Sequence, residues 1–135
     1  MKMSEVPEKF LKMLKYAEGI LETDGGSSMA VIVTTAKGEV MGFASEFADT
    51  DCIADRIAEE NRFLRSLAEH GETRISCGLC KWRNGSLDVP SANLRKELEE
   101  LDKANLEAEF LLQGSGGFQL RSIRAMRPLK VKRRL

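Results

Sequence analysis

Apolar residues near the start of the chain recur at the spacing of an amphipathic helix. They are Val6, Phe10, Met13, Leu14, Ala17, Ile20 and Leu21. Pro7 stands near the beginning of this stretch, and Gly25 and Gly26 follow its end. Helices favour proline and glycine at those places. We therefore expect a first helix that buries one face.

Two strands are predicted next. Residues 29–33 form a continuous apolar run rich in β-branched side chains, which is typical of a buried strand. Lys37 and Gly38 then predict a turn into a second strand over residues 40–44. Together the two strands form a predicted hairpin.

A long second helix follows, with Asp49 and Thr50 as candidate N-caps and an end near His70 and Gly71. Its expected apolar stripe consists of Ile53, Ile57, Leu64 and Leu67, with Ala54, Ala58 and Phe63 beside it. Residues 73–82 predict a third strand. The Asn-Gly pair at 84–85 could join that strand to residues 86–89 as a hairpin.

The third helix is predicted to open at Pro90 and Ser91, because Leu94, Leu98 and Leu101 follow at helical spacing. Residues 106–112 and 118–123 predict a closing pair of strands around a glycine-rich turn. This order of elements predicts an α/β fold, a three-layer α-β-α sandwich with a mixed five-stranded sheet. At least one parallel pair is expected, through a right-handed β-α-β crossover.

Composition restricts the class of protein. A length of 135 residues fits one domain over residues 1–135, with a basic tail from about residue 130 that we expect to fray. The 21 basic and 21 acidic residues balance, so bulk charge favours neither nucleic acid nor a membrane surface. No apolar run approaches the roughly 18 residues of a membrane span. An odd number of cysteines and no signal-peptide pattern lead us to expect a reduced, cytoplasmic protein.

The cysteines have metal-site spacing but an unsuitable placement. Cys77 and Cys80 form a C-x-x-C pair, and Cys52 and His70 could complete four ligands for zinc. Within a strand, however, positions i and i+3 point to opposite faces. Cys52 and His70 stand roughly 27 Å apart along their helix. We therefore expect buried, inert thiols and no zinc or other cofactor.

Two helix openings resemble motifs of a known family. The second helix opens Asp51-Cys52-Ile53-Ala54-Asp55-Arg56 and the third opens Pro90-Ser91-Ala92-Asn93-Leu94-Arg95. This arrangement resembles the cytidine deaminase family, in which C-A-E-R and P-C-x-x-C-R segments open the corresponding helices. The first helix, the hairpin and the stretch 123–128, similar to the family's L-x-E-L-L-P ending, extend the resemblance over roughly residues 10–129.

The resemblance implies a fold whose zinc chemistry is lost. By this matching the three zinc-ligand positions hold Ile53, Ser91 and Leu94, none of which is a competent ligand. The position of the family's proton-shuttling glutamate holds Asp55, which is one methylene shorter. If the matching of the first motif were shifted by one residue, Cys52 would stand at the first ligand position. Ser91 and Leu94 would still be unsuitable at the other two. The stretch 42–45, which ends at Ser45, lacks the family's ribose-binding Asn and Glu.

What remains at the matched site suggests anion binding. Arg56 and Arg95 follow the two motifs, and two helix N-termini beside two guanidiniums favour an acidic group. We expect a nucleotide or phosphate-bearing small molecule to be bound without turnover, by Ser45, Ile53, Arg56, Ser91, Asn93, Leu94 and Arg95. In the simpler alternative, Arg56 pairs with Asp55 or Glu59 and Arg95 lies on a solvated face.

Two further functions stay open. The chain could be an active hydrolase of the nucleoside deaminase type, with an atypical site in which Asp55 is the catalytic residue. It could also be an assembly subunit for another protein. By resemblance to the family, we expect a homo-oligomer.

Overall fold

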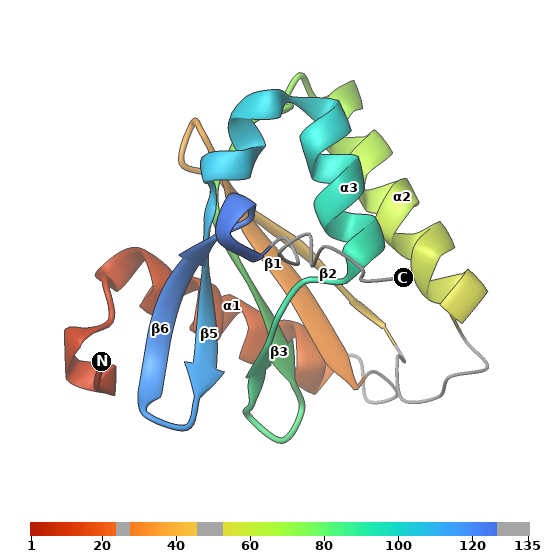
Figure 1. Cartoon of the computed structure of the whole chain (residues 1–135). Coiled ribbons are helices and arrows are strands. Elements are labelled where there is room, and N and C mark those ends of the chain that lie inside the picture. The colour runs from red at the N-terminus through yellow and green to blue at the C-terminus, as the bar shows by residue number, and fades with distance from the viewer. Residues whose placement is uncertain (24–27, 46–52, 127–135) are drawn as a thin grey trace, which may run out of the picture.

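The predicted alternation of helices and strands is present in the computed structural model, which describes residues 1–23, 28–45 and 53–126. Three of the predicted features lie outside this described part: the candidate N-caps Asp49 and Thr50, the side chain of Ile53, and the tail from residue 130. The elements are η1 (Met3–Glu5), α1 (Glu8–Thr23), β1 (Met29–Thr35), β2 (Val40–Ser45), α2 (Ile53–Glu69), β3 (Ile75–Trp82), β4 (Leu87–Asp88), α3 (Ala92–Leu101), η3 (Lys103–Glu107), β5 (Glu109–Gly114), β6 (Gly117–Ser122) and η4 (Arg124–Met126) (Figure 1).

The strands form one mixed sheet in the order β2-β1-β3-β5-β6, with the short β4 paired to β3. Neighbouring strands run antiparallel except β3 and β5, which are parallel. The expected parallel pair is therefore confirmed, and α3 lies in the crossover between its two strands. The described sheet has six strands where we expected five. The sixth is β4, which forms because the turn at Gly85 (φ 95°) folds the chain back onto β3.

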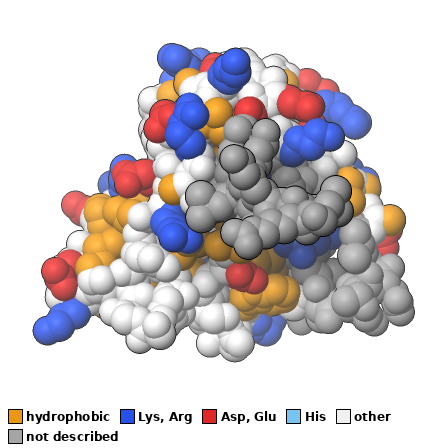
Figure 2. Space-filling view, viewed as in Figure 1, with side chains coloured by type: hydrophobic (Ala, Val, Ile, Leu, Met, Phe, Trp, Pro, Cys, Tyr) orange, Lys and Arg blue, Asp and Glu red, His pale blue; other side chains and the backbone are white. Residues whose placement is uncertain are grey.

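Helices cover both faces of the sheet, which confirms the three-layer sandwich (Figure 1). On β1, Ala30 and Ile32 face α1, while Val31 and Val33 face the layer formed by α2 and α3. The buried face of α1 consists of Phe10, Met13, Ala17 and Leu21, as its periodicity predicts. Figure 2 shows basic and acidic side chains interspersed over the α2–α3 layer. None of the described helices has the length and apolar character that crossing a membrane requires.

The buried face of α2 differs from the predicted stripe. Phe63, Leu64 and Leu67 are buried, but Ile57 is 36% exposed and the two alanines beside it are also exposed. A charged residue, Glu60, occupies the buried face instead and is 1% exposed. The first turns of α2 therefore present polar groups to α3, and only the later turns present apolar side chains to the core.

The closing hairpin begins later than predicted, because residues 103–107 form η3 rather than strand. Asn105, which is fully buried, accounts for the difference. Its side chain accepts a hydrogen bond from the backbone of Ile75 at 2.9 Å and donates to the carbonyls of Thr73 and Leu98. These bonds join η3 to α3 and to the start of β3, so Leu106 is buried from a helical turn and not from a strand.

Candidate functional site

The start of α3 is the centre of the candidate site. Ser91 is the N-cap, and its hydroxyl accepts a hydrogen bond from the backbone of Leu94 at 3.0 Å. Pro90, which directly precedes it, is buried. The local sequence therefore folds as predicted, with a serine cap that satisfies one of the free N–H groups at the helix end.

A buried carboxylate from α2 faces this helix start. The Ser91 hydroxyl lies 2.9 Å from Oε1 and 2.7 Å from Oε2 of Glu60, to which it donates. The amide Nδ2 of Asn93 donates to Oε1 of Glu60 at 3.1 Å and to Asn61 at 3.1 Å. Nε of Arg56, one turn earlier on α2, is 3.7 Å from Oε2 of Glu60. We call Glu60, Ser91, Asn93 and Arg56 the Glu60 cluster.

The charge of Glu60 is well matched to its surroundings. A carboxylate is favourable at a helix N-terminus, where unpaired N–H groups give a partial positive charge. Donors from Ser91 and Asn93 and the guanidinium of Arg56 offset the desolvation of the buried charge. The carboxylate therefore occupies the kind of position that a bound anion would take.

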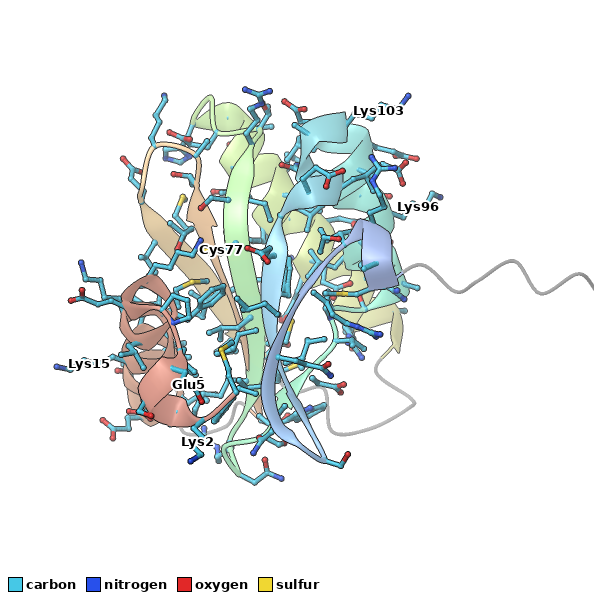
Figure 3. The ribbon with its side chains drawn as sticks, turned by 60° about the vertical axis from the view of Figure 1, so that its left-hand side comes forward. Lys2, Glu5, Lys15, Cys77, Lys96 and Lys103 are labelled. Carbon is cyan, nitrogen blue, oxygen red and sulfur yellow. The ribbon has the colours of Figure 1, made fainter. Side chains whose placement is uncertain are left out.

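The sulfur atoms lie on opposite sides of the sheet, as the strand period predicts. Cys77 packs in the α1 layer, with Sγ 3.6 Å from Sδ of Met13, and is labelled within the sheet in Figure 3. Cys80 packs in the α2–α3 layer. Burial raises the pKa of the Cys80 thiol, and the negative charge of Glu60 raises it further. Cys80 is therefore a protonated thiol beside the Glu60 cluster.

The structure gathers some of the predicted site residues and separates others. Ser91, Asn93 and Arg56 meet around Glu60. Asp55 is exposed on the first turn of α2. Ser45 ends β2 and is 9% exposed, and its carbonyl accepts a bond from the backbone of Ser28. Ile53 as a ligand-binding side chain lies outside the described residues.

The side chains of Leu94 and Arg95 on α3 are both at least partly shielded from solvent. Leu94 is fully buried in the core between the sheet and the helices, and its part in binding a ligand stays a prediction. Arg95 is half-buried rather than on a solvated face, and its Nη1 donates to the carbonyl of Met126 at 2.7 Å. Arg56 does pair with a carboxylate, that of Glu60.

Glu60 itself was missed by the sequence analysis. Its position completes the buried face of α2 at the spacing of Phe63, Leu64 and Leu67. Its i,i+4 spacing from Arg56 indicates an ion pair along the helix, and its place on the buried face is the signal of a buried charge. The predicted apolar stripe ran through Ile57 instead, which placed Glu60 outside the expected buried face.

The groups at the start of α3 do not fit the zinc that the cytidine deaminase family would hold at the matching positions. The Ser91 hydroxyl is bonded to Glu60 and to the backbone of Leu94, and Leu94 has no donor atom. The nearby Cys80 is held in its protonated form, whereas zinc binds a thiolate. Within the described ranges, no three His, Cys, Asp or Glu side chains come together as a metal site.

Comparison with known proteins supports the fold. No family model matches the chain, and no curated protein matches it. Among solved structures, the chain is similar to the crystal structure of cytidine deaminase from Mycobacterium leprae, with a TM-score of 0.61 and 17% sequence identity. The similarity covers 89% of this chain and 98% of that one. The cytidine deaminase-like fold is therefore confirmed.

Proposed function

We propose that this chain is a cytidine deaminase-like domain that has lost zinc-dependent deamination and acts as a nucleotide- or anion-binding module, or as a scaffold. The Glu60 cluster is the observation that supports this proposal. At the start of α3, where the resemblance implies metal-binding thiolates, the chain has a capping hydroxyl and a core leucine.

The bonding of the Glu60 cluster favours a structural role over hydrolytic deamination. Hydrolytic deamination needs a water whose pKa is lowered and a carboxylate that is free to move protons. The Glu60 carboxylate already accepts hydrogen bonds from Ser91 and Asn93 and faces Arg56. Asp55, the other candidate for proton transfer, is exposed. We therefore assign the cluster the role of joining α2 to α3.

Arg95 supports the binding part of the proposal. Its Nε is shielded from solvent and has no hydrogen-bond partner among the described residues, although Nη1 is bonded to Met126. A shielded donor without an acceptor is unfavourable, and an acidic group of a ligand would supply one. Arg56 lies on the adjacent helix with its side chain 29% exposed.

Metal analysis and an activity assay test the loss of deamination. We expect chain purified without added zinc to contain only traces of zinc and to release no ammonia from cytidine or cytidine monophosphate. About one zinc per chain together with ammonia release would overturn the proposal. If that release were abolished by Asp55→Asn, the alternative of an atypical hydrolase would be established instead.

Thermal shift measurements test the binding part. We expect inorganic phosphate or nucleoside monophosphates at millimolar concentration to raise the melting temperature at low salt. Arg95→Ala should remove that stabilisation, while Arg65→Ala, an exposed position on α2, should retain it. A wild-type chain that no such ligand stabilises would contradict the binding role and leave only the scaffold role.

A homo-oligomer is a second proposal, and one surface favours it. Tyr16 on α1 is 42% exposed, and an open hollow of about 490 Å³ lies between Tyr16, Gly19, Ile20 and Thr23. We propose that a second copy of the chain covers this side of α1. Tyr16→Glu should then lower the mass measured in solution, and a monomeric wild type would rule the proposal out.

A further inference from the structure

A second hollow lies between β2 and α2. It measures about 310 Å³ and is lined by Phe43, Ala44, Glu59, Arg62, Phe63 and Ser66. The four lining residues of α2 recur at helical spacing, so one face of the helix forms one wall and β2 forms the other. Glu60 does not line this space, because its side chain is bonded at the start of α3. We call this space the Phe43–Phe63 hollow.

Two aromatic rings form the apolar part of the Phe43–Phe63 hollow. The ring centroids of Phe43 and Phe63 are 5.0 Å apart, and the rings are tilted by 43°. Phe63 is buried and Phe43 is half-buried, and both pack with the core between the sheet and the α2–α3 layer. Such a pair offers a third ring both a face and an edge to pack against, and ring faces also attract a nearby cation.

Two opposite charges line the same hollow without pairing to each other. Oε2 of Glu59 is shielded from solvent and accepts no hydrogen bond from the described residues. Arg62 is exposed, and no ion pair joins it to Glu59 within the described part of the chain, although residues three apart on a helix are neighbours. A shielded carboxylate oxygen without a donor is unfavourable, so a ligand that brings a positively charged donor gains a strong contact there.

This arrangement of charges selects against simple ions. Glu59 repels an anion, and Arg62 repels a cation that carries no negative group. A zwitterion brings a donor to Glu59 and an acceptor to Arg62 at the same time, and the rings between the two charges favour an apolar, flat side chain. The residues of the hollow therefore match a small molecule with an ammonium, a carboxylate and an aromatic ring.

We propose that the Phe43–Phe63 hollow binds a free aromatic amino acid. The ammonium donates to Oε2 of Glu59, the ring packs against the two phenylalanines, and the carboxylate lies towards Arg62. The volume is at the lower end of the roughly 300–1,000 Å³ of small-molecule sites, which suits a ligand of this size. The inference goes beyond the proposed function and does not depend on it, because neither Arg95 nor the Glu60 cluster lines this hollow.

Titration calorimetry on the whole chain tests the inference with L-phenylalanine and three analogues that each lack one group. Phenylpropionate lacks the ammonium and should bind roughly tenfold more weakly, because Glu59 loses its charged donor. Phenylethylamine lacks the carboxylate and should bind roughly threefold more weakly, since a contact with the exposed Arg62 is weakened by solvent. L-alanine lacks the ring and should bind roughly tenfold more weakly or not at all.

The variant Glu59→Gln sharpens the test, because it removes the negative charge and keeps the size of the side chain. L-phenylalanine should then bind no more tightly than phenylpropionate does. The affinity for phenylpropionate itself should not fall, so this ligand shows that the variant is folded and that its hollow is intact. The matched control is Glu69→Gln, at an exposed position of the same helix, and it should bind L-phenylalanine as the wild type does.

Arg62→Ala tests the contact with the ligand carboxylate. The variant should lose the difference between L-phenylalanine and phenylethylamine, while its affinity for phenylethylamine should not fall. Arg65→Ala, also exposed on α2, is the matched control and should keep the difference.

Three results would overturn the inference. They are no binding of L-phenylalanine at millimolar concentration, equal binding of L-phenylalanine and phenylpropionate to the wild type, and wild-type discrimination between these two in Glu59→Gln. Arg95→Ala, which tests the proposed anion site, should leave the binding of L-phenylalanine unchanged. The two proposals can therefore fail separately.

Discussion

The hydroxyl oxygen of Ser91 lies 2.7 Å from Oε2 of Glu60, and 31 positions of the chain separate the two residues. The contact joins the start of α3 to the middle of α2 through a carboxylate that is 1% exposed. The same hydroxyl caps α3, so one side chain stabilises both the helix and its packing.

Glu60→Ala is expected to lower the free energy of unfolding by about 3 kcal/mol. The substitution leaves the half-buried donors of Ser91 and Asn93 without their acceptor and opens a small cavity. Urea unfolding followed by circular dichroism measures the change. Glu69→Ala at the exposed end of α2 is the control and should stay within about 0.5 kcal/mol of wild type. A loss for Glu60→Ala no larger than the control's would show that the cluster is not a stabilising contact.

Glu60→Gln should strengthen the binding of inorganic phosphate roughly tenfold at low salt. The carboxylate repels an added anion near Arg56 and Arg95, and the amide removes that repulsion while keeping the size of the side chain. Titration calorimetry at two salt concentrations gives the comparison. Glu100→Gln, exposed on α3, is the matched control for a simple change in net charge. Equal affinities of wild type and Glu60→Gln would argue against an anion near the start of α3.

The raised pKa of the Cys80 thiol leads us to expect that the free energy of unfolding falls at alkaline pH. Burial and the charge of Glu60 raise the pKa of its thiol in the folded state, while the unfolded thiol titrates near its ordinary value of about 8.5. Above that pH the unfolded state releases a proton that the folded state keeps. The contribution of Cys80 to the free energy of unfolding is therefore intact below a pH of about 8.5. Above that pH it falls by at most about 1.4 kcal/mol per pH unit. The difference in unfolding free energy between wild type and Cys80→Ala should narrow accordingly, and a difference that stays constant between neutral and alkaline pH would contradict the prediction.

Two glycines should respond oppositely to alanine. A Cβ at Gly78 on β3 would lie 2.5 Å from the ring of Phe110 on β5, so Gly78→Ala should destabilise the chain by roughly 1–3 kcal/mol. Gly19 on α1 has open space around the same position, so Gly19→Ala should stabilise by up to about 1 kcal/mol through helix propensity. Thermal unfolding of both variants provides the comparison. Similar melting temperatures for the two would mean that β3 and β5 are not packed as closely as described.

The sequence predicted the layers of the fold because its periodicities are local. The alternation along β3 was sufficient to place Cys77 and Cys80 on opposite faces, and the spacing of α1 identified its buried face. The contacts that depend on distant partners were not predictable in the same way. Glu60 is buried only because Ser91 and Asn93 meet it, and Asn105 forms a helical turn because Ile75, Thr73 and Leu98 surround it.

The candidate site was only partly predictable for the same reason, because it depends on contacts between residues far apart in the sequence. Residue types in the two helix openings indicated where α2 and α3 begin, but not which turn of α2 faces Ser91. The structure brings Glu60 to that place rather than Asp55, one turn and one residue earlier. The hollow between Phe43 on β2 and Phe63 on α2 was not expected at all, because it combines residues of a strand and a helix that carry no shared motif.

The bond from Arg95 to the carbonyl of Met126 joins the first turn of α3 to η4. Met126 is also the last residue that the structure describes. Any event that changes the position of Arg95, such as the arrival of an acidic group, therefore acts on η4 as well. A reporter dye attached on η4 would then record in its emission what happens at the start of α3.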